Sequence, residues 1–281
     1  MAKQSSRFDY YKSRQIPELT VLQASLSDFS YDRHAHDEYA FGVTLTGRQD
    51  FFSDGRFHRN PPGNVIQFNP EQVHDGHPGD DSTLGYVMVY VPSALLEASF
   101  ADAAGAERAA RFRGSETLLA DAELRRAILD LAELTTGQQG TRIDQEHALH
   151  RMATRLVHRA GKFQPGGRIS RPDALLLRAK EYIHAHLETD LSLDEISQKA
   201  HLSKYHFLRL FRQQFGITPH QYVLSCRVNA ARSALETGVA PSEVAFRYGF
   251  TDLSHFNRRF KRIYGKTPHQ YQLSVTGRHR I

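Results

Sequence analysis

The chain has 281 residues, of which 40% are hydrophobic and 10% aromatic, enough for two ordinary domains with packed cores. Its longest apolar run, residues 85–91, is far shorter than the roughly 20 residues that cross a bilayer, and residues 1–15 are too polar for a signal peptide. The single cysteine, Cys226, excludes an internal disulfide framework and a multi-cysteine zinc site. We therefore expect a protein of the reducing cytoplasm without a membrane segment.

The net charge of +5 is unevenly distributed along the chain. Residues 172–281 contain 16 Lys and Arg against 9 Asp and Glu, a balance of +7, whereas residues 1–171 contain 20 and 22, a balance of −2. A basic domain beside a nearly neutral one is typical of a nucleic-acid-binding protein with a second function. A solvated basic surface gives the same composition, so the motifs must decide.

Residues 16–92 have the pattern of short β-strands. Apolar residues alternate with small or polar ones over residues 41–45, which is typical of a half-buried strand. The dipeptide Asp54-Gly55 lies between two short apolar segments and predicts a hairpin turn. Further strands are predicted over residues 65–68 and, buried on both faces, over residues 84–91. Strands of this length and spacing predict a small sandwich or barrel.

Residues 93–161 change to a helical period, with two apolar stripes. The first stripe consists of Leu118, Leu119, Leu124, Ile128, Leu131 and Leu134. The second consists of Ala148, Leu149, Met152, Leu156 and Val157. We expect both stripes to pack on the β-strands; the alternative is that one of them also forms a dimer seam. The Pro- and Gly-containing residues 164–168 predict a linker, and the chain after about residue 172 has the pattern of helices.

A repeat at an offset of 49 residues is the most specific feature of the sequence. Residues 206–222 (HFLRLFRQQFGITPHQY) and 255–271 (HFNRRFKRIYGKTPHQY) are identical at ten of seventeen positions. Chance does not produce this agreement, so the chain contains two copies of one structural unit.

The first copy has the local signals of a helix-turn-helix. Ser192 and Glu195 form a capping box that begins a short helix. Ser203 can N-cap a second helix, which Gly216 ends in a left-handed conformation. Thr218, followed by a proline, then begins another helix. A short helix, a tight turn and a second helix is the arrangement of a helix-turn-helix.

The second copy repeats this scheme. Pro241 begins a short helix, residues 248–250 turn the chain, and Thr251 or Asp252 caps a helix that ends near Gly265. One copy alone is equally compatible with an ordinary helical hairpin. Two copies whose second helices are both basic favour DNA binding.

The segment that joins the two copies sets their spacing. Residues 218–237 have the pattern of one helix of 20 residues, which is about 30 Å long at about 1.5 Å per residue. Neighbouring major-groove segments on one side of B-DNA are about 34 Å apart. The sequence therefore predicts that one chain binds two adjacent segments of the major groove.

In each copy the second helix is expected in the major groove, with outward residues at base edges. After removal of the buried apolar positions, the first copy offers Lys204, Tyr205, Leu208, Arg209 and Arg212. The second copy offers Leu253, Ser254, Asn257, Arg258 and Lys261.

Residue chemistry divides these candidates by role. Arg209 and Arg258 can donate two hydrogen bonds to guanine, Asn257 can bind adenine, and Tyr205 and Leu208 can contact thymine methyl groups. We expect contacts with phosphates, which position the protein without specifying sequence, from Arg259, Arg262 and Lys266. The alternative for each residue is an ordinary solvated side chain.

These residues resemble the AraC/XylS family of transcriptional regulators. Residues 203–211 are similar to its first recognition helix, and residues 248–268, with YGF, HF and GKTP, are similar to its signature segment. The likeness extends from about residue 174 to Gln272, where the family usually has an arginine that contacts phosphate. The resemblance implies a transcription factor, most often an activator, with double-stranded DNA, RNA polymerase, a small-molecule effector and a second copy of the chain as partners.

The N-terminal half resembles the cupin-like sensor domain of the same family. The likeness rests on His34-Ala35-His36 before a strand, the turn at residues 61–63, and residues 69–74 (NPEQVH). The expected fold is α+β with several domains. A cupin-like β-barrel with trailing helices spans residues 1–163, a linker spans 164–171, and an all-α domain with two helix-turn-helix units spans 172–281.

Metal-binding cupins use two histidines, a glutamate about four residues later, and a third histidine. Here Ala40 stands at the glutamate position and the nearby acid is Glu38. We therefore expect no metal cofactor and interpret His34, His36 and His74 as polar residues of a pocket; ligation of Zn or Fe by these three is the alternative. The candidate effector-binding residues are His36, Glu38, Phe41 and His74.

The leading hypothesis is a ligand-responsive regulator and not an enzyme. A metalloenzyme fused to a DNA-binding domain needs a complete metal site, and the missing glutamate argues against it. A fused DNA-repair alkyl transferase needs reactive cysteines, whereas Cys226 is expected to be a packing residue. A constitutive DNA binder, whose barrel serves dimerisation alone, is the remaining alternative.

Overall fold

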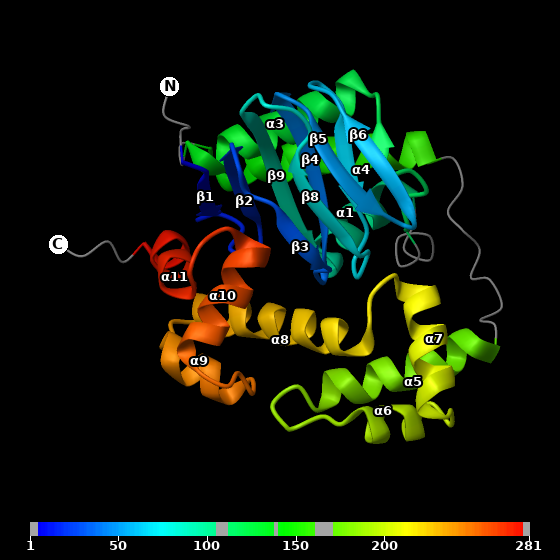
Figure 1. Ribbon diagram of the computed structural model, residues 1–281. Coiled ribbons are helices and arrows are strands. Elements are labelled where there is room, and N and C mark those ends of the chain that lie inside the picture. Colours follow the sequence, from blue (N-terminus) through cyan, green and yellow to red (C-terminus); the bar gives the residue numbers. More distant parts are fainter. Residues whose placement is uncertain (1–4, 105–111, 138–139, 161–170, 278–281) are drawn as a thin grey trace. The chain divides into compact units, whose positions relative to one another are not determined.

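The computed structural model describes residues 5–104, 112–137, 140–160 and 171–277 (Figure 1). They form two compact units. The first contains the described residues up to 160 except two short segments, residues 31–36 and 72–75, which belong to the second unit together with residues 171–277. The predicted linker lies outside the described residues apart from Arg171, which begins a helix. No described helix has both the length and the apolar character needed to span a membrane.

The strands of the structure form two hydrogen-bonded sheets. In strand order, the six-stranded sheet contains β1 (Arg7–Lys12), β2 (Thr20–Leu26), β9 (Leu84–Pro92), β4 (Glu38–Thr46), β7 (Val65–Phe68) and β10 (Leu118–Leu119). The four-stranded sheet contains β3 (Tyr31–His34), β8 (His74–Pro78), β5 (Gln49–Ser53) and β6 (Arg56–Asn60). Among the described residues the sheets stay separate, so the predicted barrel takes the form of two sheets rather than one closed sheet.

The predicted hairpin turn is confirmed between β5 and β6. Asp54 and Gly55 both have positive φ, 50° and 75°, as a two-residue type I′ turn requires. The hairpin places Phe51 of β5 against Phe68 of β7, with the rings edge to face and their centroids 5.5 Å apart. This contact joins the two sheets.

Three helices accompany the sheets: α1 (Ser93–Ala104), α3 (Ala122–Thr136) and α4 (Arg142–Ala160). Leu124, Ile128 and Leu131 of α3 and Leu149 and Met152 of α4 are buried in one core with the apolar face of the six-stranded sheet. The expectation that both helical stripes pack on the strands is therefore confirmed for these residues.

The start of the first predicted stripe is wrong. Leu118 and Leu119 form β10, which pairs with Ile66 and Val65 of β7. The helix begins only after Asp121, whose carboxylate accepts hydrogen bonds from the first-turn backbone amides.

Asp121 is also the centre of a charge cluster. It accepts hydrogen bonds from Arg155 and Arg159 of α4, at 3.0 and 3.2 Å. Burial opposes ionisation of this carboxyl, but the Leu124 amide and the two guanidinium groups outweigh it and lower its pKa. The cluster fastens α4 to the start of α3.

The second unit is helical apart from its two short segments. In chain order its helices are α5 (Arg171–Ala185), α6 (Leu193–Lys199), α7 (Lys204–Phe215), α8 (Pro219–Glu236), α9 (Pro241–Arg247), α10 (Leu253–Tyr264) and α11 (Pro268–Thr276). Figure 1 shows α8 as a long helix with α7 at one end and α9 and α10 at the other.

Candidate nucleic-acid interface

The first helix-turn-helix consists of α6 and α7. The predicted capping box of Ser192 and Glu195 is present, and Ser203 caps α7 by accepting from the His206 amide. Phe207 and Phe211 of α7 are fully buried with Ile196 of α6 in one apolar cluster. This packing turns the opposite face of α7 to solvent.

The second helix-turn-helix consists of α9 and α10 and uses the same construction. Asp252, one of the two predicted caps, accepts from the His255 amide. Val244 of α9 and Phe256 and Phe260 of α10 are fully buried. Gly265 ends α10 with φ +72°, the same value that Gly216 has at the end of α7. The repeated sequence therefore folds into two equivalent units.

Helix α8 joins the units as predicted. Thr218 caps it with a complete capping box, and its 18 residues correspond to a length of about 27 Å. Tyr222, Val223 and Cys226 pack in the apolar cluster of the first helix-turn-helix, so Cys226 is the buried packing residue that the sequence indicates.

Two arginine side chains, Arg227 and Arg247, stabilise this arrangement through polar contacts that the sequence did not predict. Arg227 of α8 donates to the carbonyls of Leu187 at 3.1 Å and Thr189 at 2.6 Å, and, at a longer 3.4 Å, to that of Gly249 in the turn of the second helix-turn-helix. Partial burial lowers the pKa of this guanidinium. Arg247 of α9 forms an exposed ion pair with Glu188, at 2.7 Å. The loop before α6 is thereby connected to both α8 and the second helix-turn-helix.

Gln272, where the family usually has arginine, has an internal role. Its side-chain amide donates to the carbonyls of Leu235 at 2.9 Å and Val239 at 2.7 Å. The hydroxyl of Tyr271 donates to Glu236, at 2.6 Å. These three bonds hold α11 against the C-terminal end of α8 and the residues after it, so Gln272 stabilises the fold.

All the candidates on α7 are exposed, as a DNA-contacting role requires. Tyr205 exposes 79% and Leu208 37% of its surface. Arg209 and Arg212 are exposed and form no hydrogen bond or ion pair with another described residue. Lys204 differs, because its ammonium forms an ion pair with Asp194 of α6 at 2.5 Å.

The candidates on α10 fall into two groups. Leu253, Ser254, Arg258, Lys261 and Arg262 are exposed, and the three cations among them form no hydrogen bond or ion pair with any other residue described. The remaining three candidates are more constrained.

Asn257 is half-buried. The exposed Arg259 donates from Nε to Nε2 of His255, at 3.4 Å, and Lys266 beyond the helix donates to Oγ of Ser274, at 2.7 Å. Burial lowers the pKa of His255, and the two neighbouring arginines lower it further. A neutral His255 can accept the bond from Arg259.

The two exposed faces correspond residue for residue. With the repeat offset of 49, Arg209 is equivalent to Arg258, and Arg212 to Lys261. Residues three apart on a helix share a face. Each helix-turn-helix therefore presents, opposite its buried aromatic residues, a pair of cations that form no hydrogen bond or ion pair with another described residue. Each unit can therefore offer guanidinium or ammonium donors to an external anion or acceptor.

The effector candidates lie in different surroundings. His36 and His74 are buried, with ring centroids 4.8 Å apart, and both belong to the second unit. Glu38 and Phe41 are buried on β4, three residues apart, and therefore on opposite faces of that strand. Phe41 packs in the core shared with α3 and α4.

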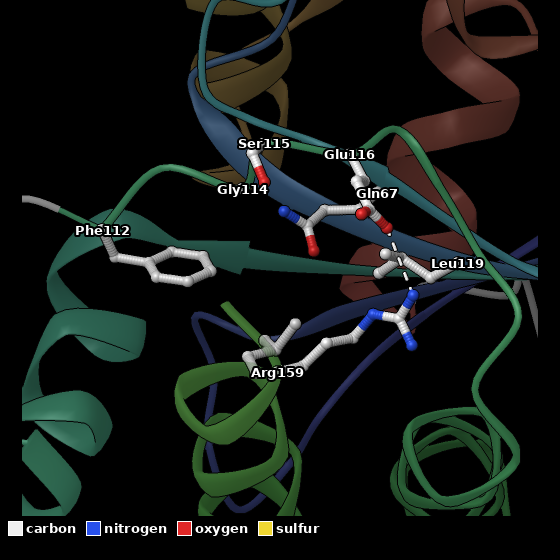
Figure 2. A pocket seen from close by; sticks show the side chains of 8 residues that line it. Gln67, Phe112, Gly114, Ser115, Glu116, Leu119 and Arg159 are labelled. Carbon is white, nitrogen blue, oxygen red and sulfur yellow. Dashed lines mark hydrogen bonds and ion pairs between the residues drawn. The ribbon is translucent and has the colours of Figure 1, made fainter. Parts of the chain in front are cut away.

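A small pocket in the first unit is lined by none of the four predicted effector-binding residues (Figure 2). It has a volume of about 40 Å³ and is lined by Gln67, Phe112, Glu116 and Arg159, among others. Arg159 closes one side through an ion pair with Glu116 at 3.2 Å. A volume of this size holds about one water molecule, so this pocket is not an effector site in the conformation described.

Both parts of the chain match known families. Residues 16–152 match the AraC-like ligand binding domain, and residues 196–274 match a helix-turn-helix domain. The chain is 30% identical over 224 residues to YbfI of Bacillus subtilis, an uncharacterized HTH-type transcriptional regulator, with 80% of each chain covered. It is 24% identical to a XylDLEGF operon transcriptional activator of Pseudomonas putida, covering 76% of this chain and 68% of that protein.

Solved structures share the fold. An apo variant of ToxT from Vibrio cholerae superposes with a TM-score of 0.60 at 12% identity, covering 92% of this chain and 97% of that one. ToxT with a bound unsaturated fatty acid gives a TM-score of 0.59 at 11% identity, with both chains fully covered. The order of a sheet-rich part followed by a helical part is therefore common to these proteins.

Proposed function

The chain belongs to the AraC family of DNA-binding transcriptional regulators, with an AraC-like ligand-binding domain, and from this premise we propose that it is a cytoplasmic activator that works as a homodimer with RNA polymerase. Activation is supported by the XylDLEGF operon activators among its relatives. The relatives are regulators of transcription, and we propose no catalytic role for this chain.

The proposed DNA contacts rest on one observation: α7 and α10 present equivalent, unengaged arginines, Arg209 and Arg258, on exposed faces. Each arginine would donate to guanine O6 and N7 in its own major-groove segment. The other base-edge contacts proposed are Lys204, Tyr205, Leu208, Arg212, Leu253, Ser254, Asn257 and Lys261. Arg259, Arg262 and Lys266 would contact phosphates, and Arg262 is the best placed of them because it is exposed and unengaged among the described residues.

The effector would bind in the sheet-rich part of the chain. Support comes from the match of residues 16–152 to a ligand-binding domain and from the bound fatty acid in the structurally similar ToxT. Of the candidate residues, His36 and His74 come together in the structure, and Glu38 is a buried carboxyl that can bind a polar ligand. The role predicted for Phe41 stays a prediction, although its place in the core favours packing.

The spacing set by α8 gives the sharpest test of this function. Preferred duplexes would first be selected from a random pool with the full-length protein, and the two half-sites mapped by footprinting. Inserting about 5 bp between the half-sites turns the second groove to the far side of the helix, whereas inserting about 10 bp restores its direction but adds about 34 Å.

Because α8 is held near its middle by Arg227 and at its C-terminal end by Gln272, we expect both insertions to reduce binding to that of one half-site. Equal affinity for the spaced and unspaced duplexes would contradict simultaneous binding by the two units. No selected sequence at physiological salt would contradict specific DNA binding itself.

A further inference from the structure

Three histidines that are distant in sequence meet in the second unit. His34, His36 and His74 are all buried, and one nitrogen from each lies within 4.8 Å of the others. The ring centroids are 4.5 to 5.6 Å apart. Three imidazoles converging on one point form the ligand set of many zinc and iron sites.

Two of these rings are held in the orientation of metal ligands. Nδ1 of His34 lies 2.7 Å from the carbonyl oxygen of Asp32, and Nδ1 of His74 lies 2.8 Å from that of Gln72. A carbonyl oxygen only accepts, so each Nδ1 carries the proton, and in the neutral ring Nε2 then carries the lone pair. Protein metal sites commonly fix their histidine ligands in this way.

We propose that His34, His36 and His74 bind one divalent transition-metal ion, with Zn²⁺ as the best match, and that the bound ion acts on α8 through Ala35. Neutral imidazoles suit zinc, and three protein ligands leave a fourth position for water or an effector. All three proposed ligands are imidazoles, which are neutral when they bind a metal, so they would not cancel the charge of the ion. This proposal replaces the expectation, based on Ala40, that the histidines bind no metal.

Metal binding would move the rings. With Zn–N bonds of about 2.0–2.1 Å in tetrahedral geometry, the ligand nitrogens are about 3.3 Å apart. The three nitrogens now lie within 4.8 Å of one another, so a bound ion would draw the rings closer together. His34 and His36 flank Ala35, and the shift must therefore reach this residue.

Ala35 is fastened to the helix that joins the DNA-binding units. Its amide donates to Oγ of Ser225 at 3.1 Å, and its carbonyl accepts from Ser225 at 3.0 Å and from the Asn229 amide at 2.8 Å. Asn229 also accepts from the Tyr264 hydroxyl of α10, at 2.8 Å. A displacement of Ala35 would therefore reach both α8 and the second helix-turn-helix.

Metal binding can be tested without DNA. The full-length protein, stripped with a chelator, would be titrated with Zn²⁺ by calorimetry and with Co²⁺ by visible absorption. We expect one ion per chain, and an affinity at least about 100-fold lower for His74→Gln. His77→Gln, a half-buried histidine on the same strand, is the matched control and should bind like the wild type.

X-ray absorption at the zinc edge of the wild-type protein gives a second measurement that does not depend on folded variants. Three imidazole nitrogens at about 2.0–2.1 Å are expected. Fewer than three, or unchanged zinc affinity in a folded His74→Gln variant, would overturn the site.

The action on α8 rests on the proposed DNA interface and needs a separate test. Zn²⁺ should change the Kd of the wild-type protein for its selected duplex by about 5-fold or more, and the duplex should change the zinc affinity by the same factor. Ser225→Ala keeps the ligands but loses two bonds to Ala35, so it should bind zinc normally and respond less. Zinc binding with an unchanged duplex Kd would overturn the coupling alone. Failure to bind any duplex, with or without zinc, would contradict the DNA interface and leave the metal site intact.

Discussion

Replacing Arg209 with alanine should weaken binding to the preferred duplex and leave nonspecific binding nearly unchanged. Arg209 is exposed and has no hydrogen bond or ion pair with another described residue. The substitution should therefore change the stability of the DNA-free protein only slightly. Surface changes of this kind usually alter stability by less than about 0.5 kcal/mol. The effect on binding therefore measures the contact with DNA.

The magnitude follows from the chemistry of the contact. A bidentate pair with guanine discriminates by about 1–3 kcal/mol, which is about a 5- to 150-fold change in Kd. Arg258→Ala should have a similar effect at the other half-site. Because the two arginines lie in separate helix-turn-helix motifs at opposite ends of α8, their effects should add in the double variant.

Fluorescence anisotropy on preferred and scrambled duplexes at several salt concentrations measures both the sequence-specific and the nonspecific affinity. Gln214→Ala, an exposed change near the C-terminal end of the same helix, is the control for helix stability. A contact with phosphate alone would give equal losses on both duplexes and reduce the salt slope by about 1. That result would refute base contact by Arg209.

Two further predictions concern the stability of the fold, with one prediction for each compact unit. Arg227→Met keeps most of the side-chain stem but removes the hydrogen bonds to three carbonyls. Urea unfolding should show that the free energy of unfolding falls by about 2–3 kcal/mol. This is less than three fully buried bonds would contribute, because the guanidinium is only partly buried. Arg247→Met, at the exposed ion pair, should cost about 1 kcal/mol or less, and equal losses would contradict this role of Arg227. Folding lowers the pKa of Asp121, so its ionised carboxylate stabilises the folded state. This stabilisation is fully present above the pKa of the unfolded chain, about 3.9, and is lost as the pH falls through the pKa of the folded state. Asp121→Asn should therefore cost about 2 kcal/mol at neutral pH, and the difference from wild type in urea unfolding should narrow below about pH 4; a constant difference would exclude the charge as its cause.

Features that depend on nearby residues were predictable from the sequence. The capping box of Ser192 and Glu195 and the cap at Thr218 involve residues three apart, and both are present. Gly216 and Gly265 adopt the left-handed conformation that their positions after two helices indicate. The hairpin at residues 54–55 follows the same logic. These contacts form within one turn, so tertiary packing cannot rearrange them easily.

Features that depend on distant partners were missed or misplaced. Strand β1 lies before the predicted start of the β region, because its alternating pattern is short and its stability comes from pairing with β2. Leu118 and Leu119 fit a helical stripe equally well, and only pairing with β7 decides for a strand. No sequence pattern predicts the role of Arg227, because its three hydrogen-bond acceptors are backbone carbonyls. The convergence of His34 with His74 likewise requires the fold.

The contacts that hold α8 limit how a signal can reach α7 and α10, the helices proposed to contact DNA. A solvated helix could bend at little cost, but α8 is buried at Val228, Ala231 and Leu235 and is fastened near its middle and at its C-terminal end by Arg227 and Gln272. Bending it would break several of these contacts together, whereas a small movement of the whole helix can preserve them. A signal that enters through Ala35 must therefore change the position of α8 as a body, and both helix-turn-helix units must respond to it together.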